Sequence, residues 1–382
     1  MNRRIEPPPI PFIDVAAQRR RLGSSIDAAI AGVLDHCQFI LGPEVAAFEN
    51  ELAAFCGARH VISCASGTDA LILALRAKGV GPGDAVFCPS FTFCATAEVA
   101  ALVGATPVFV DVQEDTFNID PDGLKTAINT ARRHGLTPKV VIPVDLFGLP
   151  ADHNAIATIA VDESLVVLDD AAQAFGAGIG GRKLGTFGDL TATSFFPAKP
   201  LGCYGDGGAV LTDDEETANT LRSLRVHGQG SDKYDNVRIG LASRLDTIQA
   251  AVLREKLNIF PEEIEARNAV ARRYAEALAD LVTVPRVPAG YVSVWAQYTI
   301  RLAAGRREMF AASLKGEGVP TAVYYPIPLH RQQAYKHYPV GDGGMAVSER
   351  LAEEVISLPM HAYLDTATQD RIIDATRRAL AR

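Results

Sequence analysis

Apolar and polar positions along the chain follow two alternating patterns, and the first consists of short, nearly continuous apolar runs. Runs of this length are typical of strands that are buried on both faces of a sheet. Seven of them fall within about 150 residues. We predict strands at 61–65, 84–89, 106–111, 139–144, 165–170, 190–196 and 208–212.

The second pattern is amphipathic, with apolar residues three or four positions apart, and it predicts the helices between these strands. We expect helices at 14–36, 44–55, 70–78, 120–133 and 213–224. Alternating strands and helices predict an α/β fold with a largely parallel central sheet. Ligands of such sheets bind at the carboxyl ends of the strands.

The pattern changes after a glycine-rich, polar stretch at 226–240, which we expect to be a mobile loop. Ser243 and Asp246 have the spacing of a capping box that opens a helix to 258. Pro261 is expected to break or kink this helix before a second one at 262–279. A β-α-β-α unit follows, so we divide the chain into an extension at 1–25, a large domain at 26–258 and a small domain at 259–382. The predicted elements of the β-α-β-α unit are a strand at 295–302, a helix at 307–317, an extended segment at 321–329 and helices at 346–356 and 366–380.

Composition narrows the function classes. The 382 residues are 48% hydrophobic and 21% charged, with a net charge of −8. The sequence has no stripe of basic residues, which argues against a nucleic-acid-binding surface. The six scattered cysteines form no Cys-x-x-Cys pair, which argues against a disulfide framework or a metal site and for a cytoplasmic location. Residues 1–11 have no apolar core of a signal peptide, and no run of about 18 apolar residues predicts a membrane span.

One lysine lies in an unusual setting. Lys199 follows the run at 190–196 and precedes a glycine-rich turn and the run at 208–212. Burial would lower its pKa from about 10.4 and make its amine a nucleophile. We interpret Lys199 as a Schiff-base lysine; the alternative is a solvated surface residue.

Two further motifs lie at expected strand ends. Ser66 to Asp69 join a strand to a helix N-terminus, where free N–H groups bind phosphate, unless Ser66 or Thr68 merely caps the helix. Asp170 ends the run at 165–170. A buried carboxylate needs a cationic partner, such as a protonated pyridine nitrogen, although Asp170 could instead cap the next helix.

Five motifs occur together along the chain. They are SGTDA at 66–70, PSFTF at 89–93, DDAAQA at 169–174, SFFPAK at 194–199 continuing into LGCYGDGG at 201–208, and SRLDTIQAA at 243–251. In this order they resemble the nucleotide-sugar aminotransferases of the DegT/DnrJ/EryC1/StrS family. The resemblance extends from about residue 12 to the C-terminus. It implies a fold of the aspartate-aminotransferase type (fold type I), pyridoxal 5′-phosphate as cofactor, and a homodimer whose active sites are shared between subunits.

The resemblance also implies roles for individual residues. Lys199 would hold the cofactor through a Schiff base and act in catalysis, and Asp170 would pair with the ring nitrogen. Substrate would be bound by Tyr324, Tyr325 and Arg244, the last from the other subunit. The remaining cofactor contacts would be Phe93 on the ring face, Gln173 near the ring's phenolic oxygen, and Gly67, Thr68 and Ser194 on the phosphate.

The segment at 324–329, together with 294–300, resembles the branch that aminates C3 of a UDP-linked 3-keto-N-acetylglucosaminuronic acid for cell-surface polysaccharides. L-Glutamate would be the donor, 2-oxoglutarate its product, and the kinetics ping-pong. The alternative is amination of C3 or C4 of a dTDP- or UDP-linked keto-6-deoxyhexose. Two departures bear on this choice, because Ala242 stands where relatives have Asn and Tyr324 where that branch often has His.

Three rival functions fit the sequence less well. Dehydratases of the family replace the lysine by histidine, which the presence of Lys199 opposes. A cofactor-binding regulator without catalysis would not need both Lys199 and Asp170. A nicotinamide-dependent oxidoreductase would want Gly-x-Gly-x-x-Gly after the first strand, whereas this strand leads into Ser66 and Gly67.

Overall fold

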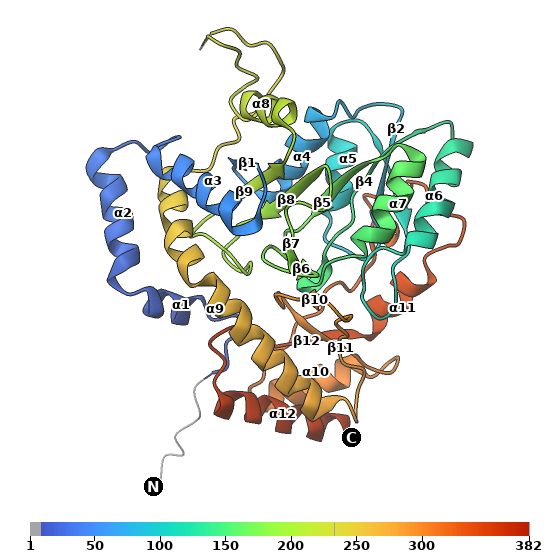
Figure 1. Cartoon of the computed structure of the whole chain (residues 1–382). Coiled ribbons are helices and arrows are strands. Elements are labelled where there is room, and N and C mark those ends of the chain that lie inside the picture. Colours follow the sequence, from blue (N-terminus) through green and yellow to red (C-terminus); the bar gives the residue numbers. More distant parts are fainter. Residues whose placement is uncertain (1–8, 233, 382) are drawn as a thin grey trace.

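The computed structural model describes residues 9–232 and 234–381. Within them, seven strands form the central sheet in the order β1-β9-β8-β5-β4-β2-β3 (Figure 1). The predicted seven-stranded sheet is confirmed, with boundaries that shift by a few residues. The strands are β1 His60–Cys64, β2 Asp84–Pro89, β3 Thr106–Val110, β4 Thr137–Val141, β5 Val166–Asp170, β8 Leu190–Ser194 and β9 Gly208–Thr212.

The sheet is mostly parallel, as predicted. Strands β3, β2, β4, β5 and β8 pair in parallel, whereas β9 runs antiparallel to both β8 and β1. Strand β1 therefore points the same way as the parallel set. The carboxyl ends of β1, β2, β5 and β8 meet at one edge, where the sequence places its candidate chemistry.

Helices cover both faces of the sheet, because alternate strand residues pack into different apolar clusters. One cluster joins the sheet to α4, α5 and α8, and the opposite face packs against α6 and α7 and, beside β1, against α3 and α9. The bounds are α3 Pro43–Cys56, α4 Gly67–Ala77, α5 Ala95–Leu102, α6 Pro121–Arg133, α7 His153–Glu163 and α8 Glu215–Leu224.

The N-terminal segment differs from the predicted single helix at 14–36. It forms α1 Val15–Leu22 and α2 Ser24–His36. Gly23 between them has a φ of +56°, a left-handed conformation that favours glycine and turns the chain. Residues 1–8 of the predicted extension, and most of the segment examined for a signal peptide, lie outside the described residues.

Helix α9, Thr247–Leu278, joins the two helices that were predicted on either side of Pro261. Pro261 lies inside it and does not end it. The lost backbone bond is offset by packing on both sides of the proline, where Leu257, Phe260 and Ile264 are buried. The helix also runs through the predicted domain boundary at 258/259 (Figure 1), so that division stays a prediction.

The predicted capping box is wrong. Helix α9 begins after Asp246, whose side chain makes no capping bond. The Ser243 hydroxyl instead accepts a hydrogen bond from the Ala65 N–H at 3.3 Å, which ties this segment to the end of β1. Arg244 therefore precedes the helix and does not lie in its first turn.

The C-terminal part packs against the second half of α9. Strands β11 Tyr298–Arg301 and β12 Val355–Leu358 form an antiparallel pair, flanked by α10 Arg307–Gly316, α11 Ala346–Glu354 and α12 Thr366–Leu380. The predicted helix at 346–356 thus ends early, since its last residues enter β12. The short elements are β6 Gly178–Ile179, β7 Arg182–Lys183 and β10 Tyr291–Val292, which form a small sheet, and the 3-10 turns Leu146–Gly148 and Leu329–Arg331.

In the described part of the chain, no helix is both long and apolar enough to cross a membrane. The predicted cytoplasmic location stays a prediction.

Candidate active site

A cavity of about 470 Å³ opens at the carboxyl edge of the sheet. Nine of the ten predicted site residues line it, and Arg244 does not. Five elements distant in sequence thus bring their polar side chains to one place. The nine are Gly67, Thr68, Phe93, Asp170, Gln173, Ser194, Lys199, Tyr324 and Tyr325.

Lys199 reaches this cavity from the turn that follows β8. Its backbone N–H donates to the Phe196 carbonyl oxygen at 2.8 Å, which fixes the turn. Burial lowers the pKa of its amine, and the negative charge of Asp170 partly opposes that shift. Lys199 is half-buried and lines the cavity, which does not fit a solvated surface lysine, and burial shifts its amine toward the neutral, nucleophilic form.

Asp170 ends β5 and is only 5% exposed. Its carboxylate accepts from the Thr96 hydroxyl at 3.0 Å and from the Ala172 N–H at 3.2 Å. Burial raises its pKa, while these two donors and the charge of Lys199 lower it. Residues 172–176 form a turn, so the alternative that Asp170 caps a following helix is wrong.

The turn after β1 lines the cavity with Ser66, Gly67 and Thr68. Ser66 caps α4, because its hydroxyl accepts a hydrogen bond from the Asp69 N–H at 3.1 Å, as the helix-capping alternative predicted. The first N–H groups of the helix still have no intrahelical partner. A Cβ on Gly67 would lie 2.6 Å from the Ser194 Cβ, so only glycine lets the start of α4 pack this closely against the end of β8.

Aromatic and amide side chains line the cavity beside Lys199 and Asp170. Gln173 donates to the Tyr325 hydroxyl at 3.0 Å and accepts from the Phe147 N–H at 3.0 Å. Burial raises the pKa of Tyr325, so this phenol stays protonated. Phe93 is 52% exposed, an unusual exposure for phenylalanine and one suited to a flat ring stacked on it.

Sequence reasoning missed several residues of the site. Thr96 does not line the cavity itself, but it bonds Asp170 from the first turn of α5, and no motif marks it. Ile13 comes from the segment before α1 and Gln297 from the segment before β11. Asp206 also lines the cavity. It lies within the motif at 201–208, and this motif was the signal by which Asp206 could have been predicted.

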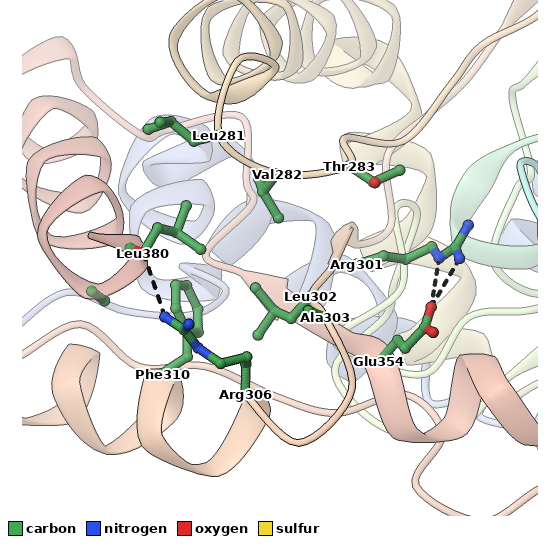
Figure 2. A pocket seen from close by; sticks show the side chains of 11 residues that line it. Leu281, Val282, Thr283, Arg301, Leu302, Ala303, Arg306, Phe310, Glu354 and Leu380 are labelled. Carbon is green, nitrogen blue, oxygen red and sulfur yellow. Dashed lines mark hydrogen bonds and ion pairs between the residues drawn. The ribbon is translucent and has the colours of Figure 1, made fainter. Parts of the chain in front are cut away.

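A second cavity, of about 420 Å³, lies among β11, α10 and α12 (Figure 2) and contains no predicted site residue. Its charged side chains already have partners. Arg301 pairs with Glu354 at 2.8 Å, and Arg306 donates to the Leu380 carbonyl oxygen at 3.4 Å. This cavity offers no comparable set of reactive groups.

The fold and the lysine–aspartate cavity together define an enzyme of the aspartate-aminotransferase type. The model of the DegT/DnrJ/EryC1/StrS aminotransferase family matches residues 20–377, and the chain belongs to that family. The predicted family, fold class and enzyme class are confirmed.

Two similar curated proteins are sugar-nucleotide aminotransferases by name. The UDP-2-acetamido-2-deoxy-3-oxo-D-glucuronate aminotransferase of Pseudomonas aeruginosa is 49% identical over 94% of this chain and 97% of its own length. The dTDP-3-amino-3,4,6-trideoxy-alpha-D-glucose transaminase of Streptomyces venezuelae is 40% identical over 99% and 98%.

Solved structures agree with the fold. A DegT DnrJ EryC1 StrS aminotransferase from Brucella abortus superposes with a TM-score of 0.96 at 55% identity and covers 98% of this chain and 100% of its own. NtdA from Bacillus subtilis, solved with bound cofactor PMP, has a TM-score of 0.89 at 30% identity, over 100% and 87%.

Proposed function

We propose that the chain is an aminotransferase that uses pyridoxal phosphate to aminate a nucleotide-linked ketosugar. The cavity fits this cofactor. The buried carboxylate of Asp170 and the N-terminus of α4, at Gly67 and Thr68, both line the cavity, and a helix N-terminus favours a phosphate. The observation that carries the proposal is that Lys199 and Asp170 line the same cavity as this turn.

Each residue has a separate task in this proposal. Pyridoxal phosphate, when bound, supplies an electron sink for the carbon that gains or loses the amino group. The Lys199 amine, with its lowered pKa, removes a proton as a general base and returns it as a general acid. Asp170 would hold the ring nitrogen through its negative charge, and Gln173 fixes the Tyr325 hydroxyl by a hydrogen bond of 3.0 Å.

The substrate of the proposed enzyme is a UDP-linked N-acetylated uronic acid with a keto group at C3, and L-glutamate is the donor. The 49% identity to an aminotransferase named for that sugar supports this choice. The second candidate, a dTDP- or UDP-linked keto-6-deoxyhexose, is supported by the 40% identity to a dTDP-sugar transaminase. Tyr324, at the position where that branch often has His, lines the cavity, and its ring centroid lies 6.4 Å from that of Phe12.

A substrate panel tests this assignment. Purified enzyme is mixed with L-glutamate and either the UDP-linked 3-keto uronic acid or dTDP-linked 3- and 4-keto-6-deoxyhexoses, and 2-oxoglutarate is measured. We expect kcat/KM for the uronic acid to exceed the others by about 10²-fold, since a site built for a carboxylate leaves polar groups unpaired with the other sugars. A higher value for a dTDP sugar would favour the second candidate.

We further propose a homodimer in which Arg244 serves the partner's site. Arg244 does not line its own chain's cavity. The segment between α8 and α9 projects from the body (Figure 1), and its Val237 and Ile239 are exposed apolar side chains, which suit a second copy of the chain.

Subunit mixing tests this arrangement. Lys199→Ala and Arg244→Ala are each expected to be strongly impaired, because each homodimer lacks one essential group at both sites. After joint refolding, a mixed dimer would hold one site with both groups, so activity should recover to about a quarter of the wild-type value. If both groups act within one chain, mixing will restore nothing.

A further inference from the structure

Three buried titratable side chains lie behind Asp170 and do not line the cavity. Asp145 lies in the segment after β4, Asp169 precedes Asp170 in β5, and His153 begins α7. All three side chains are buried, and one polar atom from each lies within 4.8 Å of the others.

Two carboxylate oxygens of this cluster have no hydrogen-bond donor among the described residues. Asp145 Oδ1 accepts from the Ala151 N–H at 2.6 Å and from His153 Nε2 at 3.0 Å, and Asp169 Oδ2 accepts from the Thr191 hydroxyl at 3.4 Å. Asp145 Oδ2 and Asp169 Oδ1 are buried without a partner among the described residues. Leaving both as bare anionic oxygens would be costly, and one proton between them would satisfy both.

His153 does not supply that proton. Its Nε2 points at Asp145, and its Nδ1 is buried with no acceptor in the described chain. A charged imidazole would bury an unpaired Nδ1–H, so the neutral ring with its proton on Nε2 fits better. The ring stacks on Phe187 at 5.1 Å between centroids, which fixes its orientation.

We propose that Asp145 and Asp169 share one proton in a buried acid–carboxylate pair, and that this pair positions Asp170 and Gln173. Asp145 donates its own N–H to the Asp170 carbonyl oxygen at 3.1 Å. Its carboxylate also closes the loop to Ala151, and within that loop the Phe147 N–H holds Gln173 at 3.0 Å. The consequence for cofactor binding rests on the proposed function, whereas the shared proton does not.

The charges around the pair favour the shared proton. Burial raises the pKa of Asp145 to about 7. Burial together with the charge of Asp145 raises the pKa of Asp169 well above its ordinary value, and these two causes outweigh the opposing effect of His153. Asp170 adds a third negative charge to both. The other titratable groups that face the pair are His153 and Tyr291, whose own pKa is raised by burial and by Asp152 and Asp145.

Infrared difference spectra of the cofactor-free protein test the shared proton. Asp145→Asn can place its amide oxygen on Ala151 and His153 and its N–H on Asp169, so it replaces the proton and keeps every contact. We expect a carboxylic-acid C=O band at neutral pH in wild type that is missing in Asp145→Asn and present in Asp162→Asn, a control at an exposed position of α7, the helix that His153 begins. The absence of that band in wild type would overturn the proposal, as would a stoichiometric divalent metal in the purified protein.

Thermal unfolding gives a second readout. A folded-state pKa raised above the unfolded one stabilises the fold at low pH, and this contribution is lost as the pH rises through the folded pKa. The Tm of wild type relative to Asp145→Asn should therefore fall as the pH rises from about 4 through the raised pKa values of the pair, of which that of Asp145 is about 7 and that of Asp169 is also raised well above its ordinary value. A difference that is constant with pH would contradict the shared proton.

The positioning role is tested separately by cofactor affinity. Asp145→Ala leaves Asp169 unpaired and opens the loop, so we expect the Kd for pyridoxal phosphate to rise about tenfold. Asp145→Asn should restore it to near the wild-type value. Equal affinities of Asp145→Ala and wild type would refute positioning while leaving the proposed aminotransferase function intact.

Discussion

Lys199→Ala is expected to lower turnover by about 10²–10⁴-fold, the usual contribution of a positioned general acid–base group. The substitution removes both the amine that would bond the cofactor and the group that would move the proton. Cofactor should still bind, since Asp170 and the turn at 66–68 stay in place. The measurement is single-turnover formation of 2-oxoglutarate, together with the absorbance of the bound cofactor.

A surface lysine serves as the control for this prediction. Lys315→Ala on α10 is exposed and should retain wild-type turnover. Lys199→Arg keeps a positive charge but offers no nucleophilic amine at neutral pH, so it should be as impaired as Lys199→Ala. Turnover by Lys199→Ala within tenfold of wild type would show that Lys199 does not carry the reaction.

Asp170→Asn is expected to have the second-largest effect, a loss of about 10²–10³-fold in turnover. The amide keeps the size of the side chain but removes the negative charge that would hold the ring nitrogen protonated. Binding through Lys199 and the phosphate turn should persist. The half-reaction with glutamate, followed by absorbance in a stopped-flow instrument, measures the step that depends on this charge.

Thr96→Val separates the charge of Asp170 from its orientation. It removes one hydrogen bond, of 3.0 Å, to a charged group and leaves the carboxylate in place. Such a bond is worth about 1.5–3 kcal/mol, so the loss in turnover should be smaller than for Asp170→Asn. An Asp170→Asn enzyme as fast as wild type would remove Asp170 from the mechanism.

Sequence alone sufficed for the sheet and for most of the cavity, because both depend on local patterns. Continuous apolar runs mark buried strands wherever they occur, and parallel strands bring their carboxyl ends to one edge. Ser66 and Asp170 each end a predicted strand or directly follow one, and their meeting at one cavity follows from that strand assignment. The role of Ser194, which lies inside the predicted strand at 190–196, came from the family resemblance.

The errors and omissions arose where tertiary contacts override local signals. Ser243 has capping-box spacing, but its hydroxyl bonds Ala65 of another strand. Pro261 is a helix breaker whose neighbours are buried deeply enough to keep α9 continuous. The pair of Asp145 and Asp169 spans 24 positions of sequence with His153 between them, and no spacing rule joins the three.

The central claim is that Lys199 bonds the cofactor, and reductive trapping tests it most directly. The holoenzyme is treated with borohydride and digested, and the peptide that contains residue 199 is analysed by mass spectrometry. We predict that this peptide carries the mass of a reduced phosphopyridoxyl group, and that the peptides of Lys183 and Lys256 do not. Label on another lysine, or no label on a protein that contains the cofactor, would contradict this account.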